Sequence, residues 1–187
     1  EEIPQPAHRI SDEDLVEHLN WYGLGQADAE TVIQTIFRVR NLARWYARYG
    51  RDLSENEIRT FLIVPVLLAF GWSERKIKIE WNHTDISLFH AVFEKGAEPE
   101  VILESKRIGE GLRYAERQAK RCAEKLGGCH QLVASDGVRY QLYDKQDGGE
   151  WKRHTKAYLN LPNLKDRHPY LADIGGAPKL FTSLMPR

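Results

Sequence analysis

Two acidic residues and one lysine have types and spacing that could hydrolyse a phosphodiester. Glu104 and Lys106 stand two residues apart at the end of the apolar run 101–103, so in a β-strand both side chains project from the same face. Asp85 begins a second strand-like segment, and an adjacent strand would place its carboxylate beside that of Glu104. Two neighbouring carboxylates bind a hard divalent cation such as Mg²⁺.

The chemistry of such a site follows from its parts. The cation polarises a phosphoryl oxygen and lowers the pKa of a bound water, and the lysine orients that water or stabilises the developing negative charge. The spacing alone is a weak signal, because an Asp…Glu-x-Lys pattern occurs by chance in many chains. The alternative is a surface ion pair between Glu104 and Lys106, with Asp85 as a turn residue.

Hydrophobic periodicity and turn residues predict the elements that would position these side chains. Ser11 is expected to cap a helix that reaches Tyr22, and Ser54 with Glu57 forms a capping-box pattern for a third helix that Pro65 should kink. The expected helices span residues 12–22, 28–49, 55–70, 111–126 and 178–184, and the expected strands span 76–81, 85–93, 100–107, 131–135, 138–144 and part of 151–158.

This order of elements predicts an α/β fold in which a mixed central sheet is flanked by helices, with an extra helical segment at the N-terminus. The expected organisation is a helical segment over residues 1–50 packed on a core over residues 51–158, followed by a C-terminal extension over 159–187. The length of 187 residues suits one compact domain.

Residues 57–144 resemble the PD-(D/E)XK nuclease superfamily, most closely the N-terminal nuclease domain of type I restriction enzyme R subunits and their stand-alone relatives. Five features carry the resemblance in order. They are a helix from Glu57 to Trp72, the aspartate strand 85–89, the Glu-x-Lys strand 101–107, Gln118-Ala119 on the next helix, and the hairpin 133–143.

The resemblance implies a restriction-endonuclease-like fold and a role for each matching residue. The implied catalytic residues are Asp85, Glu104, Lys106, Glu57 and Gln118. Asp85 and Glu104 would be ligands of Mg²⁺, for which Mn²⁺ is expected to substitute, and the backbone carbonyl of Ser105 would be a third ligand. Lys106 would be the catalytic lysine.

Three positions depart from the family pattern or have a simpler explanation. Thr84 stands where the pattern has proline, and Cys122 stands where many relatives carry a tyrosine four residues after the glutamine. Glu57 is also the third residue of the helix that Ser54 caps, which explains it without chemistry.

The expected partner is DNA. Five basic residues follow the Glu-x-Lys strand or lie on the polar side of the next helix, where they could contact phosphates; they are Arg107, Arg113, Arg117, Lys120 and Arg121. The alternative is an ordinary solvated helix face. The helix over residues 28–49 adds Arg38, Arg44 and Arg48, with Trp45 and Tyr46 between them, and these two rings are expected to pack in the core.

The charge distribution, the cysteine count and the apolar runs limit the kinds of partner and the cellular location that are expected. The formal net charge is zero, yet residues 1–34 carry −7 and residues 151–187 carry +5, which permits a basic face on a neutral protein. Two cysteines are too few for a disulfide framework or a four-ligand zinc site, so free thiols and a cytoplasmic location are expected. The longest apolar run, residues 61–72, is too short to span a bilayer, and no membrane partner is expected.

Three hypotheses remain open on the sequence. The first is a Mg²⁺-dependent DNA endonuclease related to restriction systems. The second is a catalytically silent nucleic-acid-binding or assembly module of the same fold. Because no P-loop motif is present, motor or specificity subunits would be on other chains, and a homodimer stays open. The third is a different enzyme or a protein-interaction domain, in which the two carboxylates are ordinary surface residues; Asp85 and Glu104 on opposite faces of the sheet would favour it.

Overall fold

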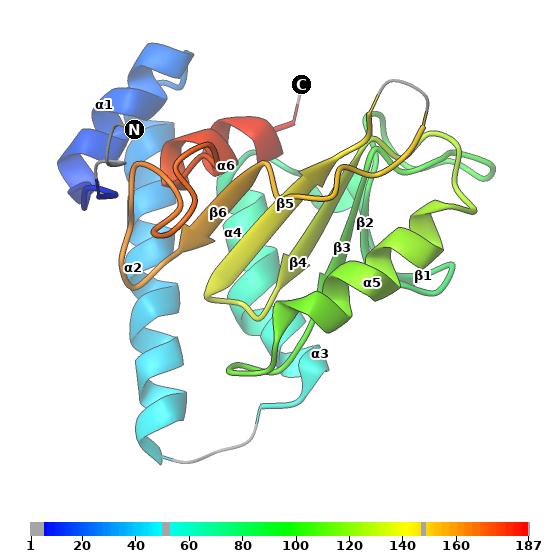
Figure 1. Cartoon of the computed structure of the whole chain (residues 1–187), viewed down its shortest axis with the longest axis horizontal. Coiled ribbons are helices and arrows are strands. Elements are labelled where there is room, and N and C mark those ends of the chain that lie inside the picture. Colours follow the sequence, from blue (N-terminus) through cyan, green and yellow to red (C-terminus); the bar gives the residue numbers. More distant parts are fainter. Residues whose placement is uncertain (1–5, 50–52, 147–148, 187) are drawn as a thin grey trace, which may run out of the picture.

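The computed structural model describes residues 6–49, 53–146 and 149–186, so the expected boundary between residues 50 and 51 lies outside the described residues. One mixed sheet crosses the molecule in the order β1-β2-β3-β4-β5-β6 (Figure 1). Its strands are β1 (Ile77–Trp81), β2 (Thr84–Leu88), β3 (Val101–Ser105), β4 (Gln131–Ser135), β5 (Arg139–Asp144) and β6 (Ala157–Asn160). The helices are α1 (Asp12–Tyr22), α2 (Gln26–Tyr49), α3 (Glu55–Ile58), η1 (Arg59–Ile63), α4 (Val64–Ala69), η2 (Glu74–Lys76), α5 (Leu112–Ala123) and α6 (Ala177–Leu184).

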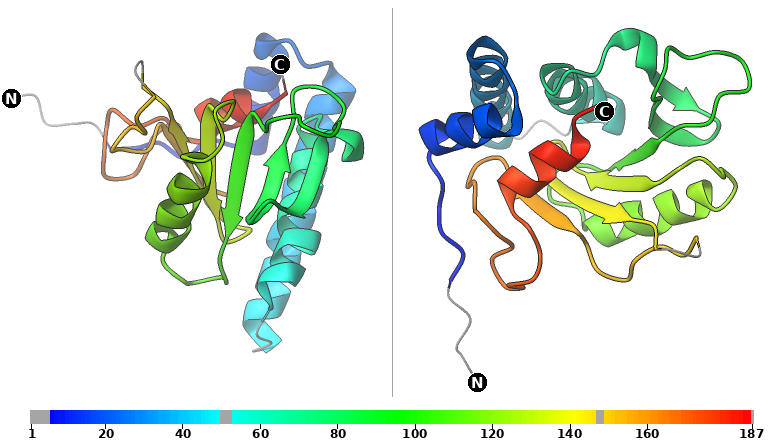
Figure 2. Two further views of the ribbon diagram at one scale, coloured as in Figure 1. Left: turned by 90° about the vertical axis from the view of Figure 1, so that its right-hand side faces the viewer. Right: turned by 90° about the horizontal axis from the view of Figure 1, so that it is seen from above.

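The sheet separates two layers of helices (Figure 2). Strands β3 and β4 are parallel and are joined through α5, whereas every other neighbouring pair is antiparallel. Helix α5 packs Ala119 and Ala123 on Ile102 and Leu132 of one face. Helices α1, α2, α4 and α6 share the apolar core of the other face. The predicted α/β arrangement of a mixed sheet flanked by helices is therefore confirmed.

The two longest buried helices follow the predicted periodicity. In α2 the buried positions are residues 29, 32, 36, 39 and 43, and in α5 they are residues 112, 115, 119 and 123. Both series repeat every three or four residues, which places them on one face of a helix. No helix in the described part of the chain combines the length and the apolar character that a membrane span requires.

Three strands differ from the prediction. The strand expected over residues 100–107 is β3, which ends at Ser105, so Lys106 directly follows the strand, and its N–H donates to the carbonyl of Ser135 at 2.9 Å. The sequence predicts a strand over residues 85–93, but β2 ends at Leu88, because the rings of Phe89 and Phe93 turn to pack edge-to-face on Trp81. The edge strand that was expected within residues 151–158 lies further along the chain, as β6 from Ala157 to Asn160.

The helix that Pro65 interrupts contains a π-helical segment. The N–H of Val64 donates to the carbonyl of Arg59, five residues earlier. A proline in a helix has no N–H, and its ring collides with the carbonyl four residues back; the wider π turn before Pro65 accommodates both. Segments of this kind occur frequently at functional sites, and this one carries a buried arginine, Arg59.

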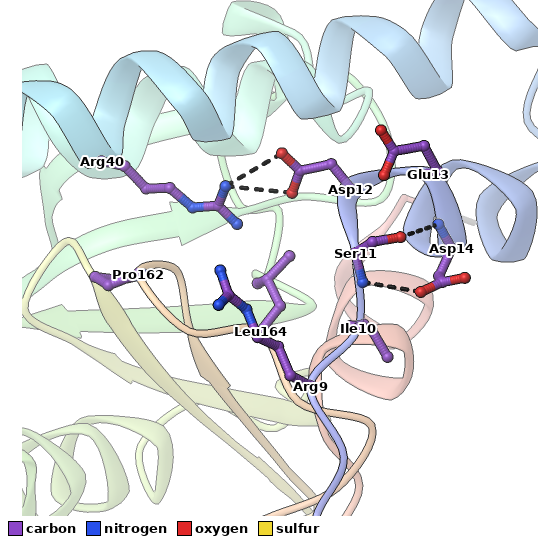
Figure 3. Close-up of a pocket in the computed structure, with 9 residues that line it drawn as sticks. All are labelled: Arg9, Ile10, Ser11, Asp12, Glu13, Asp14, Arg40, Pro162 and Leu164. Atoms are coloured by element: carbon purple, nitrogen blue, oxygen red, sulfur yellow. Dashed lines mark hydrogen bonds and ion pairs between the residues drawn. The ribbon is translucent and has the colours of Figure 1, made fainter.

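The N-terminal helices are joined to the sheet by Arg40 of α2. Its guanidinium bonds Asp12 at the start of α1, as Figure 3 shows, and donates to the carbonyl of Leu161 after β6. Ser11 caps α1 through a capping box with Asp14. These groups border a cleft of about 410 Å³. Arg40 is consequently turned toward the core and away from the outer face of α2.

Gly137, in the turn between β4 and β5, fits tightly under the helix that carries Arg59. Its φ is +87°, and a Cβ would lie 2.8 Å from the Cβ of Leu62 and 3.1 Å from Ile58. Gly137→Ala is expected to lower the free energy of unfolding by roughly 3 kcal/mol, since backbone strain and overpacking add. Gly96→Ala, at φ +94° with nothing near its Cβ, should cost only about 1 kcal/mol. Urea unfolding of both variants checks this, and equal losses would contradict it.

Candidate functional site

The two acids singled out in the sequence are neighbours at one end of the sheet. Strands β2 and β3 are antiparallel with Ile86 opposite Leu103, so Asp85 at the start of β2 meets Glu104 near the end of β3. The backbone N–H of Asp85 lies 3.4 Å from Oε1 of Glu104. The two acids therefore do not lie on opposite faces of the sheet, the arrangement that would have favoured the third hypothesis.

Asp85 is held by three hydrogen bonds. Its Oδ2 accepts from the backbone N–H and from the hydroxyl of Ser105, both at 2.7 Å. Its Oδ1 accepts from the guanidinium of Arg59 at 2.6 Å. These bonds fix the orientation of the carboxylate. Ser105 contacts Asp85 through its donors, and the role of its carbonyl as a metal ligand stays a prediction.

Arg59 and Glu80 belong to the site but were missed in the sequence. The guanidinium of Arg59 donates to Asp85 and also to Glu80 at 2.6 Å. Glu80 has a φ of +53°, a conformation that non-glycine residues rarely adopt and that often marks a functional site. The available signal was an arginine between Ile58 and Leu62, on the face of the helix that the apolar pattern assigns to the core.

Glu104 is fully buried, and one of its oxygens is not hydrogen-bonded within the described part of the chain. Its exposed fraction is 0%, and among the described residues none forms a hydrogen bond with Oε2. Burial, together with the smaller effect of the nearby Asp85 charge, raises the pKa of Glu104 to about 8, although the backbone N–H of Asp85 and the charge of Lys106 act in the opposite direction. Glu104 therefore carries a proton at neutral pH while no cation is beside it.

The two acids of α3 have different partners: Glu55 contacts Lys106, and Glu57 bonds Ser54. The ammonium of Lys106 lies 3.4 Å from the carboxylate of Glu55. Glu57 instead accepts from the N–H of Ser54 at 2.9 Å and from its hydroxyl at 2.8 Å, and these bonds hold the pKa of Glu57 below its usual range. The predicted capping box is confirmed, and the acid that contacts Lys106 at this helix start is Glu55 rather than Glu57.

Helix α5 faces the acids with Cys122. Its thiol lies 3.3 Å from the carbonyl of His83, and burial followed by the charge of Glu104 raises the pKa of Cys122. Gln118 is half-buried one turn earlier; within the described residues no hydrogen bond joins it to Asp85 or Glu104, and its assisting role stays a prediction.

The basic residues expected to contact DNA occupy the outer side of this region. Arg107, Arg113, Arg117 and Arg121 are exposed. Lys120 is half-buried because it pairs with Glu116 at 2.6 Å and lies over the ring of Tyr143. Four of the five cations are thus exposed to solvent, with the Arg117 guanidinium over the ring of Tyr114; their contact with DNA stays a prediction.

Asp85 and Glu104 supply two of the oxygen ligands that a small divalent cation needs. Among the residues that the structure describes, no group of three or more His, Cys, Asp or Glu side chains is arranged to hold a metal ion. Asp85 and Glu104 form a pair, which is enough for Mg²⁺ because this ion keeps several waters and takes one or two carboxylates. The unpartnered Oε2 of Glu104 supplies an oxygen that lacks a donor or a cation.

Comparisons with models of protein families, with curated proteins and with solved structures find no significant match.

The buried acid gives a pH dependence that can be measured without knowing the function. Glu104 keeps its proton in the folded state up to about pH 8, whereas the unfolded chain releases it near its ordinary pKa of 4.5. The free energy of unfolding should therefore fall by roughly 3–5 kcal/mol between these two values as pH rises. Glu104→Gln should remove most of that slope.

Urea unfolding in EDTA at several pH values checks this. Glu124→Gln, at an exposed position of the α5 C-terminus, is the matched control and should keep the wild-type slope. A slope that Glu104→Gln leaves unchanged would assign the pH dependence to other groups.

Proposed function

We propose that this chain is a metal-dependent endonuclease that hydrolyses DNA phosphodiester bonds, of the restriction-endonuclease-like type that the sequence resembles. One observation carries the proposal. A fully buried carboxylate oxygen of Glu104 has no partner beside Asp85, and Lys106 follows two residues later. The restriction-system connection rests on the sequence resemblance, and the order of β2, β3, α5 and β4 is consistent with it.

The carboxyl pair explains why a cation would bind here. Burial disfavours the charged form of Glu104, and the neighbouring charge of Asp85 adds to this effect, so Glu104 retains its proton. Asp85 and Glu104 would hold the divalent ion, which when bound supplies Lewis acidity and a water of lowered pKa. Ser105 and Arg59 keep the Asp85 carboxylate in place through their donors.

Lys106 is placed to act on the reacting phosphate. Its side chain is 13% exposed, and its ammonium lies 3.4 Å from the carboxylate of Glu55. This contact holds the ammonium near the end of β3. Its positive charge would stabilise the negative charge that develops on the phosphoryl oxygens, and the exposed arginines of α5 would position the duplex.

Removal of the Lys106 ammonium tests the proposal. Purified protein with supercoiled plasmid and Mg²⁺ or Mn²⁺ should produce nicked and linear DNA, and EDTA should stop the reaction. Lys106→Ala is expected to lower the rate by roughly 100-fold or more, while Lys125→Ala, an exposed lysine at the far end of α5, keeps it. Equal cleavage by wild type and Lys106→Ala would show that the activity is a contaminant.

A second function is favoured by a different observation. Arg59 already gives Asp85 a cationic partner at 2.6 Å, which satisfies this carboxylate without a metal. A catalytically silent module of the same fold would bind nucleic acid or partner subunits and would show no cleavage with either metal. The plasmid assay above, with DNA binding measured in parallel, separates the two functions.

A further inference from the structure

The outer face of α2 carries three arginines and three aromatic rings. We call this set the α2 stripe; it consists of Phe37, Arg38, Arg44, Trp45, Arg48 and Tyr49. All six are exposed, and the buried residues of α2 lie on the opposite side of the helix. The spacing of these six residues keeps them on one face of the helix over three turns.

The charge of the α2 stripe is unbalanced. No acidic residue occurs between positions 31 and 49 of a chain whose net charge is zero. Arg40, the fourth arginine of this stretch, is turned away and bonded to Asp12 and Leu161. The three exposed guanidinium groups therefore form a positive surface, which is complementary to a phosphate backbone.

The aromatic rings of the α2 stripe lie in the solvent rather than in the core. The sequence predicts that Trp45 and Tyr46 pack inside; Tyr46 does so in part, but Trp45 is 44% exposed, Tyr49 58% and Phe37 60%. The rings of Trp45 and Tyr49 lie 5.2 Å apart, and the guanidinium of Arg48 lies 5.9 Å from the Tyr49 ring. Exposed rings interleaved with arginines are the surface on which unpaired bases stack.

The helix that carries the α2 stripe also borders the part of the molecule that holds the proposed site. The face of α2 opposite the stripe packs on α4 and on the π-helical segment that carries Arg59. The C-terminal half of α2 extends beyond the sheet at the end where α3 and the loop between β3 and α5 lie (Figures 1 and 2). A DNA strand that runs off this half of α2 would therefore pass toward the end of the sheet at which β3 ends.

We propose that the α2 stripe binds single-stranded DNA, with Arg38, Arg44 and Arg48 on its phosphates and with Trp45 and Tyr49 stacked on its bases. The inference rests on the proposed function, because the α2 stripe would supply the DNA strand to the proposed nuclease site at Asp85, Glu104 and Lys106. Unpaired bases, rather than a duplex, are the ligand because a duplex offers phosphates to the arginines but no ring faces to the aromatic residues.

Binding can be tested in EDTA, so that cleavage plays no part. Fluorescein-labelled oligothymidylate of about 20 nucleotides, an abasic strand of equal length and a duplex of equal length are titrated with the full chain by anisotropy. Oligothymidylate should bind tightest. Arg44→Gln with Arg48→Gln should weaken it about 10-fold or more at low salt and reduce the salt slope by about 1.4, since each phosphate contact contributes about 0.7 for a single strand.

A control double variant and a variant that lacks one aromatic ring complete the binding experiment. Lys95→Gln with Lys125→Gln removes the same charge from exposed positions at the other end of the sheet and should change little. Tyr49→Ser should weaken oligothymidylate roughly 5- to 100-fold and leave the abasic strand unaffected. Equal affinity for all three DNAs, or equal losses for both double variants, would overturn the inference. Loss of cleavage in Lys106→Ala with unchanged oligothymidylate binding separates this result from the test of the proposed function.

Discussion

Glu104→Gln is expected to weaken Mn²⁺ binding by roughly 100-fold or more. The amide has no negative charge, and the wild-type carboxyl becomes a ligand only by releasing its proton. Because its pKa is about 8, Glu104 is mostly protonated at pH 7, and each ion bound should release close to one proton. Isothermal titration calorimetry in two buffers of different ionisation enthalpy measures the affinity and the proton release together.

The matched control is Glu57→Gln. Glu57 belongs to the same predicted acidic set, but its carboxylate is bonded to Ser54. A glutamine at this position also closes a capping box, so Glu57→Gln should keep helix α3 and have little effect on the ion. Wild-type protein that binds Mn²⁺ without releasing a proton would show that the ion sits elsewhere. Equal weakening in Glu57→Gln and Glu104→Gln would place Glu57 in the metal site after all.

Much of the sheet could be predicted because local pattern and tertiary packing agree there. The hairpin around Asp136-Gly137, the capping box of Ser54 and the apolar stripes of α2 and α5 each require one particular local structure, and each was found. The ends of β2 and β6 were missed because they depend on contacts distant in sequence. The Trp81, Phe89 and Phe93 rings end β2, and such packing leaves no periodic trace in the chain.

The candidate site was predictable only where its residues lie on a strand or directly follow one, as Lys106 follows β3. A strand has a period of two, so the relation between Glu104 and Lys106 is visible in the sequence, and the turn before Asp85 suggested where β2 begins. Arg59, Glu55 and Glu80 reach the site from a π-helical segment, a helix start and a strained strand residue. Neither a π turn nor a positive φ at a glutamate can be read from residue types, so the partners of Asp85 and Lys106 stayed hidden.

Arg59→Met is expected to lower the free energy of unfolding in EDTA by roughly 3–5 kcal/mol, which is the usual result of removing one partner of a buried ion pair. The Arg59 side chain is 7% exposed and that of Asp85 is 15% exposed, so water cannot replace the lost contact. Glu80 is 67% exposed and should adapt. Adding Asp85→Asn to Arg59→Met should cost little more, because the unpaired charge is then gone.

Arg59→Met also shows whether Arg59 only supports the fold or competes with a divalent ion for Asp85. If Arg59 and a divalent ion both neutralise Asp85, then Mn²⁺ should raise the melting temperature of Arg59→Met more than that of the wild type, because the ion replaces the missing charge. Arg40→Met removes another largely buried arginine, one paired with Asp12, and should lose stability without gaining sensitivity to Mn²⁺. An equal Mn²⁺ effect in wild type, Arg40→Met and Arg59→Met would mean that Arg59 supports the fold alone and that the ion does not bind at Asp85.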